Sequence, residues 1–184
     1  MAPTLTTERL VLRPWRESDR GPFAELNADP VTMERLPTVL DRAASDDLAE
    51  RIGAGLDERG WGLWAVEVPG RTGFAGFVGL NPPDFEADFT PCVEIGWRLH
   101  RDHWGHGFAT EGARAVLDHA FTVVGFDEIV SFTSVGHAAS RHVMEKIGLH
   151  HVGEFDHPRL AGHHLERHAL YRITAEQHRA AAAT

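Results

Sequence analysis

Residues 94–121, EIGWRLHRDHWGHGFATEGARAVLDHAF, decide how the chain is expected to fold. The first six read as a strand, and from Phe108 onward apolar side chains recur at steps of three and four, which predicts an amphipathic helix. Gly105 and Gly107 stand between the two elements. A helix that follows such a turn presents unpaired N–H groups and the positive end of its dipole, so the stretch predicts a backbone site for an anion. A tight corner without a ligand is the alternative.

Two familiar phosphate motifs do not fit this turn. A dinucleotide-binding loop needs a third glycine where Thr110 stands, and its ribose-binding carboxylate follows the next strand, whereas Asp127 and Glu128 precede that strand. A nucleoside-triphosphate loop needs Lys and then Ser or Thr after its last glycine, and the chain has neither there. The anion is therefore expected to belong to another class of ligand.

The rest of the chain alternates between strand and helix patterns, each bounded by Gly, Pro or polar turn residues. Its order predicts a mixed α/β (α+β) fold, in which a mostly antiparallel sheet has one parallel pair around the crossover helix. The expected strands are 8–15, 61–68, 73–81, 91–99, 128–135, 150–156 and 166–173, and the expected helices are 18–28, 43–59, 108–124 and 138–148.

Composition limits the classes of protein. A length of 184 residues suits one domain over 1–184, with a frayed tail from about 176 to 184. The net charge of -9 argues against nucleic-acid partners. The chain has neither a membrane-length apolar run nor a leader-like start, which predicts a cytoplasmic protein without a membrane partner. The one cysteine excludes an internal disulfide, and the 13 histidines lack metal-site spacing, so we expect no metal and solvated or loop histidines.

The stretch 94–121 resembles the acetyl-CoA-binding segment of the GNAT superfamily of N-acetyltransferases. Four more stretches are similar to its RimJ/RimL-like branch of ribosomal-protein N-terminal acetyltransferases. The resemblance implies the GNAT fold with a splayed parallel strand pair, acetyl-CoA as cosubstrate, and acetyl transfer to the primary amine of a protein N-terminus or a small molecule. The four stretches are TERLVLRPWRESD (7–19), GFVGL (76–80), SRHVMEKIGL (140–149) and RHALYRIT (167–174).

The resemblance also implies which residues bind the coenzyme. The backbone of one strand end would pair with the pantetheine arm, the glycine turn would hold the pyrophosphate, and two residues near the last helix would approach the arm and the sulfur. His137 stands where relatives carry an asparagine that bonds to the arm. The residues are, in that order, Trp97, Arg98 and Leu99; Trp104, Gly105, His106, Gly107, Phe108, Ala109 and Thr110; and His137 and Ser140.

Two residues are the predicted catalytic groups. Glu94 lies on an otherwise apolar strand, where burial would raise its pKa toward that of a general base; a carboxylate paired with Arg98 is the alternative. Ser140 shares a helix face with Met144 and others, and the resemblance implies that it stabilises or protonates the leaving thiolate; a helix-capping hydroxyl is the alternative. Cys92 would allow an acyl-cysteine intermediate, but a lone strand cysteine favours apolar packing. Met144 replaces the tyrosine acid of many relatives.

The acceptor is not specified by the sequence. Loop 81–90, NPPDFEADFT, has no regular structure of its own and is the expected lip of the acceptor site. Its acidic residues would suit a cationic amine. A coenzyme A-binding regulatory protein without catalysis and a different phosphate-ligand protein are the other functions considered, and a homodimer is left open.

Overall fold

The computed structural model describes residues 2–182. Within them the hydrogen-bonded order of the strands is β1-β2-β3-β4-β5-β6-β8-β7. The chain divides into two compact units. Unit 1 is built from the chain up to Leu80 and from Gly96–Val116, and unit 2 from Asn81–Ile95 and the chain after Leu117. No helix of the described residues is long and apolar enough to cross a membrane.

The strands of unit 1 are antiparallel neighbours from β1 to β4. Leu12 of β2 lies opposite Val66 of β3, and Trp64 of β3 opposite Val78 of β4. Three helices accompany them, and α2 begins at its N-cap Asp41 and ends at Gly60, whose φ of 74° closes the helix. The elements are β1 (Leu5–Thr6), β2 (Val11–Arg13), β3 (Leu63–Val68), β4 (Thr72–Asn81), α1 (Arg20–Ala28) and α2 (Arg42–Arg59). β5 (Glu94–Leu99) from Gly96 onward and α3 (Phe108–His119) up to Val116 also belong to unit 1.

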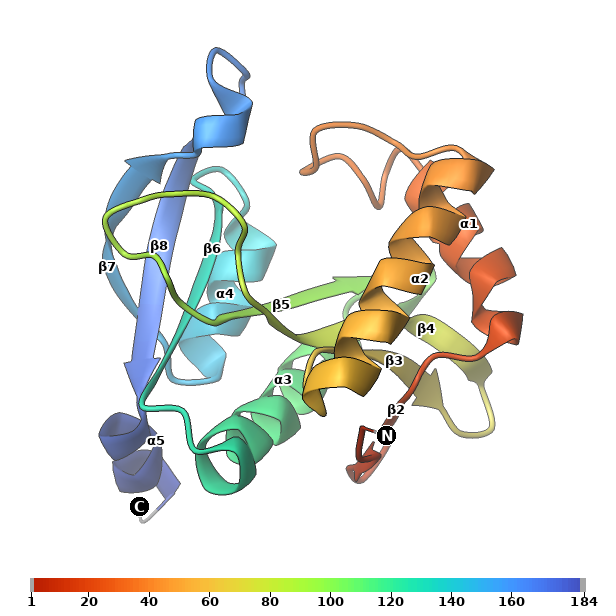
Figure 1. Cartoon of the computed structure of the whole chain (residues 1–184), viewed down its shortest axis with the longest axis horizontal. Coiled ribbons are helices and arrows are strands. Elements are labelled where there is room, and N and C mark those ends of the chain that lie inside the picture. Colours follow the sequence, from red (N-terminus) through yellow and green to blue (C-terminus); the bar gives the residue numbers. More distant parts are fainter. Residues whose placement is uncertain (1, 183–184) are drawn as a thin grey trace. The chain divides into compact units, whose positions relative to one another are not determined.

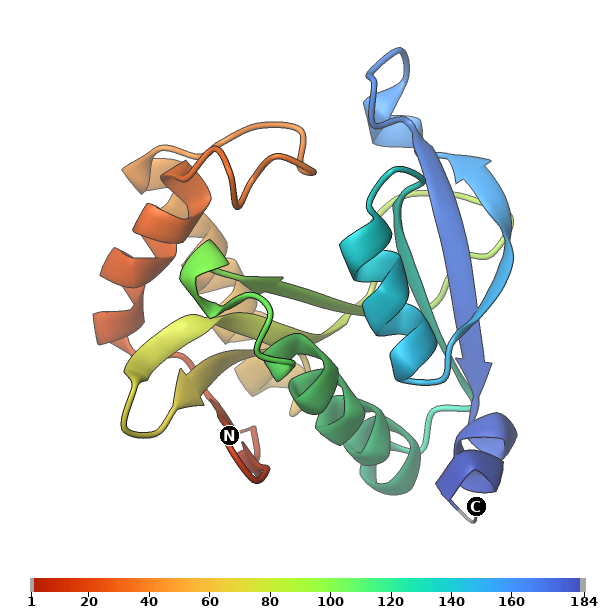
Figure 2. The ribbon, with the colours of Figure 1, turned by 180° about the vertical axis from the view of Figure 1, so that it is seen from behind.

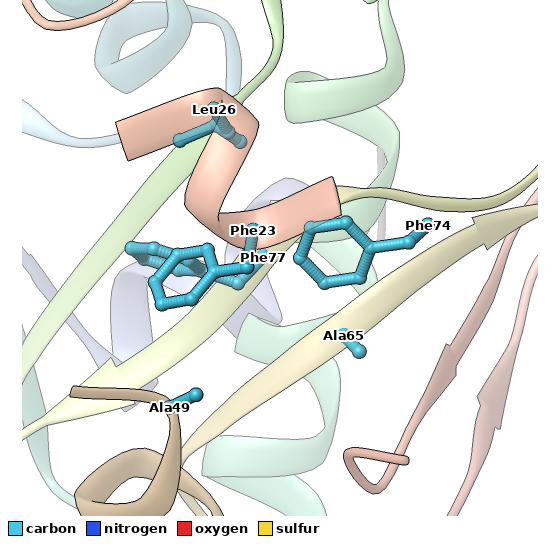
Figure 3. Close-up of a cluster of buried hydrophobic side chains, with 6 residues drawn as sticks. All are labelled: Phe23, Leu26, Ala49, Ala65, Phe74 and Phe77. Atoms are coloured by element: carbon cyan, nitrogen blue, oxygen red, sulfur yellow. The ribbon is translucent and has the colours of Figure 1, made fainter. Parts of the chain in front are cut away.

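The helices of unit 1 cover opposite faces of its strands. Figure 1 shows α1 and α2 in front of β3 and β4, and Figure 2 shows α3 on the other side. Alternation along β4 separates the two faces, because Phe77 packs with α1 while Val78 approaches Gly112 of α3. The buried cluster under α1 and α2 consists of Phe23, Leu26, Ala49, Ala65, Phe74 and Phe77 (Figure 3).

Unit 2 contains the parallel pair that the order of elements predicted. Glu94 at the start of β5 pairs with Val130 of β6 (Glu128–Ser134). β8 (Arg167–Thr174) runs antiparallel to β6 and to the edge strand β7 (His150–Asp156). Helix α4 (Ala138–Lys146) lies on one face of β6 and β8, and the loop after β4 crosses the other face (Figures 1 and 2). The predicted mixed, mostly antiparallel sheet is therefore confirmed.

The C-terminal tail corrects one prediction. Residues Ala175–Ala182 form helix α5 where a frayed tail was expected, and residues 183 and 184 lie outside the described part. Thr174 and Gln177 explain the start of this helix, because each side chain accepts a hydrogen bond from the backbone N–H of the other, at 2.9 and 3.3 Å. His178 then bonds to Asp118 at 2.7 Å, which holds the helix against the end of α3.

Candidate active site

The predicted pyrophosphate turn connects β5 to α3 in unit 1. A short 3₁₀ helix, Arg101–His103, follows β5, and the indole N–H of Trp104 donates to the carbonyl of Leu99 at 2.8 Å. This bond ties the turn to the end of the strand. Gly105 and Gly107 have φ of 74° and 79°, a left-handed conformation that favours glycine. Both are exposed, so a ligand can reach the turn.

The turn fits a diphosphate group. The first backbone hydrogen bond of α3 runs from Glu111 N to Gly107 O at 3.0 Å, so the helix itself leaves the N–H groups of Phe108, Ala109 and Thr110 without a partner. A Cβ built on Gly105 would meet no atom within 4 Å. Free N–H donors at a helix N-terminus are what a phosphate requires, and the open space beside Gly105 leaves room at the turn.

Two arginines that the sequence did not single out flank this turn. Arg9, which precedes β2, donates to the carbonyl of His106 at 3.0 Å and pairs with Glu111. Arg71, between β3 and β4, lies 3.0 Å from the ring of His106. Their guanidinium groups lie 5.1 and 5.8 Å from the ring centre of Phe108. Arg71 adds positive charge near the start of α3, whereas the charge of Arg9 is paired with Glu111. Only the fold brings residues so distant in the sequence together.

The predicted pantetheine residues form the end of β5. Strand alternation places the side chains of Trp97 and Leu99 on one face and that of Arg98 on the other. Beyond the strand, His100 N donates to Ala75 O at 2.9 Å, which continues the contact with β4. The role assigned to these residues concerns their backbone, and it stays a prediction.

Glu94 has the electrostatic setting expected of a general base. It keeps part of its surface accessible, but the protein packed around the carboxylate displaces water, and this burial raises the pKa of Glu94 to about 8. No ion pair or hydrogen bond to its side chain is found within residues 2–182, so the alternative of a paired carboxylate is wrong. A carboxyl group with this pKa exchanges a proton readily near neutral pH.

Aromatic rings cover the face of unit 2 on which Glu94 lies. The register places Glu94 beside Val130, and Phe132 is two residues further along the same face of β6. Phe85 of the loop lies 5.6 Å from Phe132, and Phe89 lies 4.8 Å from Phe155 of β7. This apolar cover is consistent with the raised pKa of Glu94.

An open pocket lies against the loop expected to form the lip of the acceptor site. Its volume is about 480 Å³, and its lining residues come from the loop and from Pro91, which follows it. The charge of Asp84, which was expected to attract a cationic amine, is already paired with Arg159 at 2.7 Å. The lining residues are Pro83, Phe85, Glu86, Ala87, Thr90 and Pro91.

Ser140 and His137 lie at the start of α4. Ser140 is 8% exposed and faces inward, and no hydrogen bond to its hydroxyl is found in the described chain, so the helix-capping alternative is wrong. His137 is the N-cap residue, and its Nδ1 lies 3.0 Å from Thr133 Oγ1. The Ser140 hydroxyl is therefore uncommitted, whereas one ring nitrogen of His137 is engaged within the protein.

The two predicted catalytic residues lie on opposite faces of the unit 2 sheet. Thr133, which contacts His137, is on the α4 face of β6, whereas Val130, the partner of Glu94, has the opposite orientation. The structure therefore brings Ser140 together with His137 on one face and places Glu94 on the other, under the loop.

Cys92 is unsuited to nucleophilic attack. Burial, with a smaller effect of the Glu94 charge, raises the pKa of its thiol to about 11. The thiolate is the reactive form, so this shift leaves very little nucleophile at neutral pH. The apolar role favoured by the sequence agrees with this setting.

The only tyrosine and two of the histidines pack within unit 2. Tyr171 is buried, accepts a hydrogen bond from Arg141 and donates one to Glu145, both at 3.1 Å. The expectation of solvated or loop histidines is wrong for His168, which lies in β8 and is 9% exposed. Its ring centre is 5.1 Å from that of His157. Burial lowers the pKa of both imidazoles. Within residues 2–182 no group of three or more His, Cys, Asp or Glu is placed to hold a metal ion.

Comparison with known proteins identifies the class to which this site belongs. The model of the acetyltransferase (GNAT) domain matches residues 9–150. The chain is 34% identical to an uncharacterized protein of Bacillus subtilis, YkkB, over 80% of this chain and 85% of that protein. It is 33% identical to the FsC-acetyl coenzyme A-N(2)-transacetylase of Aspergillus fumigatus, over 83% of this chain and 67% of that protein.

A solved structure gives the same result for the fold. Mycobacterium smegmatis RimJ in complex with CoA-disulfide superposes with a TM-score of 0.77 at 21% identity, covering 98% of this chain and 94% of that one. The chain belongs to the GNAT family of acetyltransferases. It is thus an acyl-transferring enzyme of class EC 2.3.1, and the family uses acetyl-CoA as its cosubstrate.

Proposed function

We propose that this enzyme transfers an acetyl group directly from acetyl-CoA to a primary amine, and that it belongs to the RimJ/RimL-like branch of its family. The observation that carries the proposal is the position of Glu94, whose carboxylate lies without a partner among the described residues on the face that aromatic rings cover; burial there raises its pKa to about 8. The acceptor is the amine of a protein N-terminus or of a small molecule. The four stretches similar to the RimJ/RimL-like branch support the assignment to that branch.

The residues of the glycine turn hold the coenzyme. The N–H groups from Gly105 to Thr110 bind the pyrophosphate, Arg71 contributes positive charge, and the backbone of 97–99 binds the pantetheine arm. Acetyl-CoA supplies the activated acetyl thioester. The left-handed glycines and the open space at the turn support this assignment.

Glu94 removes the proton from the acceptor. An amine attacks a carbonyl only in its neutral form, whereas most primary amines are protonated at neutral pH. A carboxylate of pKa about 8 is matched to an ammonium group better than an exposed one with the ordinary value of 4.5. Glu94 accepts the ammonium proton directly or through one water molecule.

Ser140 assists the leaving group. Ser140 is 8% exposed at the first turn of α4, and its hydroxyl has no hydrogen-bond partner within residues 2–182, so it can donate to a developing thiolate. Met144, at the position of the tyrosine acid of many relatives, has no proton to give. Direct transfer agrees with the high pKa of Cys92, since a covalent route would need its thiolate.

The test is a pH series of acetyl transfer by the wild type and by Glu94→Gln. Thiol release from acetyl-CoA is measured over a panel of primary amines between pH 6 and 9.5, and the best amine is used for both enzymes. We expect the kcat/KM of the wild type to fall about tenfold per pH unit below pH 8 and that of Glu94→Gln to lie at least 100-fold lower at pH 8. The amine is common to both enzymes, so its own ionisation cancels in the ratio.

A matched control and a binding measurement complete the test. Glu176→Gln removes an exposed carboxylate of α5 and is expected to leave the pH profile unchanged. If Glu94→Gln matched the wild type at every pH, Glu94 would not be the base. Tight binding of acetyl-CoA by calorimetry, with no turnover of any amine, would instead support a coenzyme A-binding protein without catalysis.

A further inference from the structure

Arg98 carries a charge for which the protein supplies no counter-ion. Its guanidinium donates to Asn27 Oδ1 at 2.7 Å and lies 5.3 Å from the ring centre of Phe77. Asn27 is 0% exposed and is fixed in turn by Ser45, to which its Nδ2 donates at 2.9 Å. No carboxylate of residues 2–182 forms an ion pair with Arg98. One amide oxygen and one aromatic face therefore hold a guanidinium with five N–H donors.

This arrangement is unfavourable unless an anion completes it. A cation withdrawn from water without a partner costs free energy, and burial lowers the pKa of Arg98 to about 10. The side chain still carries its charge at neutral pH. It also remains partly accessible, so its remaining donors can be reached from solvent. Arg98 is therefore held in place as in a salt bridge, but no carboxylate of the described residues pairs with it.

The face on which Arg98 lies separates it from the pyrophosphate turn. Arg98 contacts Phe77 of β4 and Asn27 of α1, which belong to the α1 and α2 face of unit 1. The turn and α3 lie on the other face, where Gly112 approaches Val78. The strands of unit 1 therefore stand between the guanidinium and the turn. An anion bound by Arg98 would therefore be a different group from the diphosphate that the turn fits.

We propose that Arg98 binds a carboxylate carried by the amine acceptor, so that the preferred substrate contains both a primary amine and a carboxylate. The inference rests on the function proposed above and adds the class of acceptor. A carboxylate is preferred to a phosphate because the site offers a single positive charge and the planar fork of Arg matches two carboxylate oxygens. Asn27 and Ser45 position the guanidinium, and they do not touch the acceptor.

The test compares amines in matched pairs. Each pair consists of an amino acid or short peptide-like amine with a free carboxylate and the same molecule with a carboxamide instead, at saturating acetyl-CoA. We expect the wild type to prefer the carboxylate member by about 10- to 100-fold in kcat/KM, the range for hydrogen bonds to a charged group. Arg98→Gln is expected to remove that preference mainly by raising KM for the carboxylate member. Because the comparison between the two members of a pair uses the wild-type enzyme, it does not depend on whether any variant folds.

Two controls separate a binding role from a packing role. Arg51→Gln removes an exposed arginine of α2 and is expected to keep the preference, and Arg98→Lys is expected to restore part of it. The dissociation constant of acetyl-CoA is expected to be the same in Arg98→Gln and the wild type. Equal rates of the wild type with both members of every pair would overturn the inference while leaving acetyl transfer intact. No turnover of any amine would instead count against the proposed function.

Discussion

Replacement of Glu94 by Gln is expected to stabilise the protein at alkaline pH while it impairs catalysis. Burial raises the pKa of this carboxyl from the ordinary 4.5 to about 8, so between these values the folded state binds more protons than the unfolded state. Stability of the wild type therefore falls as pH rises through this window, by up to about 1.4 kcal/mol per pH unit. Gln cannot ionise, so the variant escapes this loss.

The magnitude follows from the shift. The rise in the pKa of Glu94 from 4.5 to about 8 means that the wild type can lose at most about 5 kcal/mol of stability above pH 8. Because Glu94 is partly accessible and water can approach it, we expect about 2–3 kcal/mol, which corresponds to a melting temperature about 4–12 °C higher for the variant at pH 9. Toward pH 4.5 and below the pH-dependent difference should vanish, because the carboxyl then becomes protonated in the unfolded state as well as in the folded state.

The assay is thermal and urea unfolding of the wild type, Glu94→Gln and the control Glu176→Gln at half-unit steps from pH 4.5 to 9.5. Any constant difference between Glu and Gln side chains shifts the whole curve, so the change with pH is the quantity to compare. A difference between Glu94→Gln and the wild type that stays constant over this range would refute a buried carboxyl with a raised pKa. A growing difference for Glu176→Gln as well would show that general charge, not Glu94, is responsible.

Two further substitutions test the turn and the cysteine. Gly105→Ala forces an alanine to φ near 74° in open space. We expect the variant to lose about 1–2 kcal/mol of stability and to bind acetyl-CoA several-fold more weakly by calorimetry. The control Gly162→Ala, with φ of 77° and equally open space, should lose the same stability and keep the affinity for acetyl-CoA. Cys92→Ala should retain turnover within about twofold, since burial raises the pKa of the thiol to about 11; a 100-fold loss would favour an acyl-cysteine route.

The parts of the fold that follow from local patterns were predictable. The helix after Gly107 repeats its apolar residues at helical spacing, and Gly125 ends that segment with φ of 83°, as a helix-terminating glycine should. The parallel pair followed from the strand, helix and strand order alone. Helix α5 was not predicted, although Thr174 and Gln177 have the spacing of a capping box and the alanines that follow favour a helix.

The arrangement of the predicted catalytic residues depends on register, which no local pattern provides. Alternation predicts that Glu94 and Val130 each point to one side of their own strand. Only the pairing of Glu94 with Val130 shows that Glu94 shares a face with Phe132, and the contact of Thr133 with His137 shows that Ser140 belongs to the other. A one-residue slip in this pairing would have turned Glu94 away from Phe132 and toward the other face.

Arg98 shows why a side-chain role can differ from the role that a motif assigns. The resemblance concerns the backbone of residues 97–99, for which any side chain would serve. The side chain of Arg98 points to the α1 face because Trp97 and Leu99 occupy the other, and there it meets Asn27, whose amide is already fixed by Ser45. An amide oxygen satisfies one donor and leaves the charge unbalanced, whereas an aspartate at position 27 would have neutralised it. A fixed, charged and unneutralised guanidinium is the arrangement expected where the counter-ion arrives with the substrate.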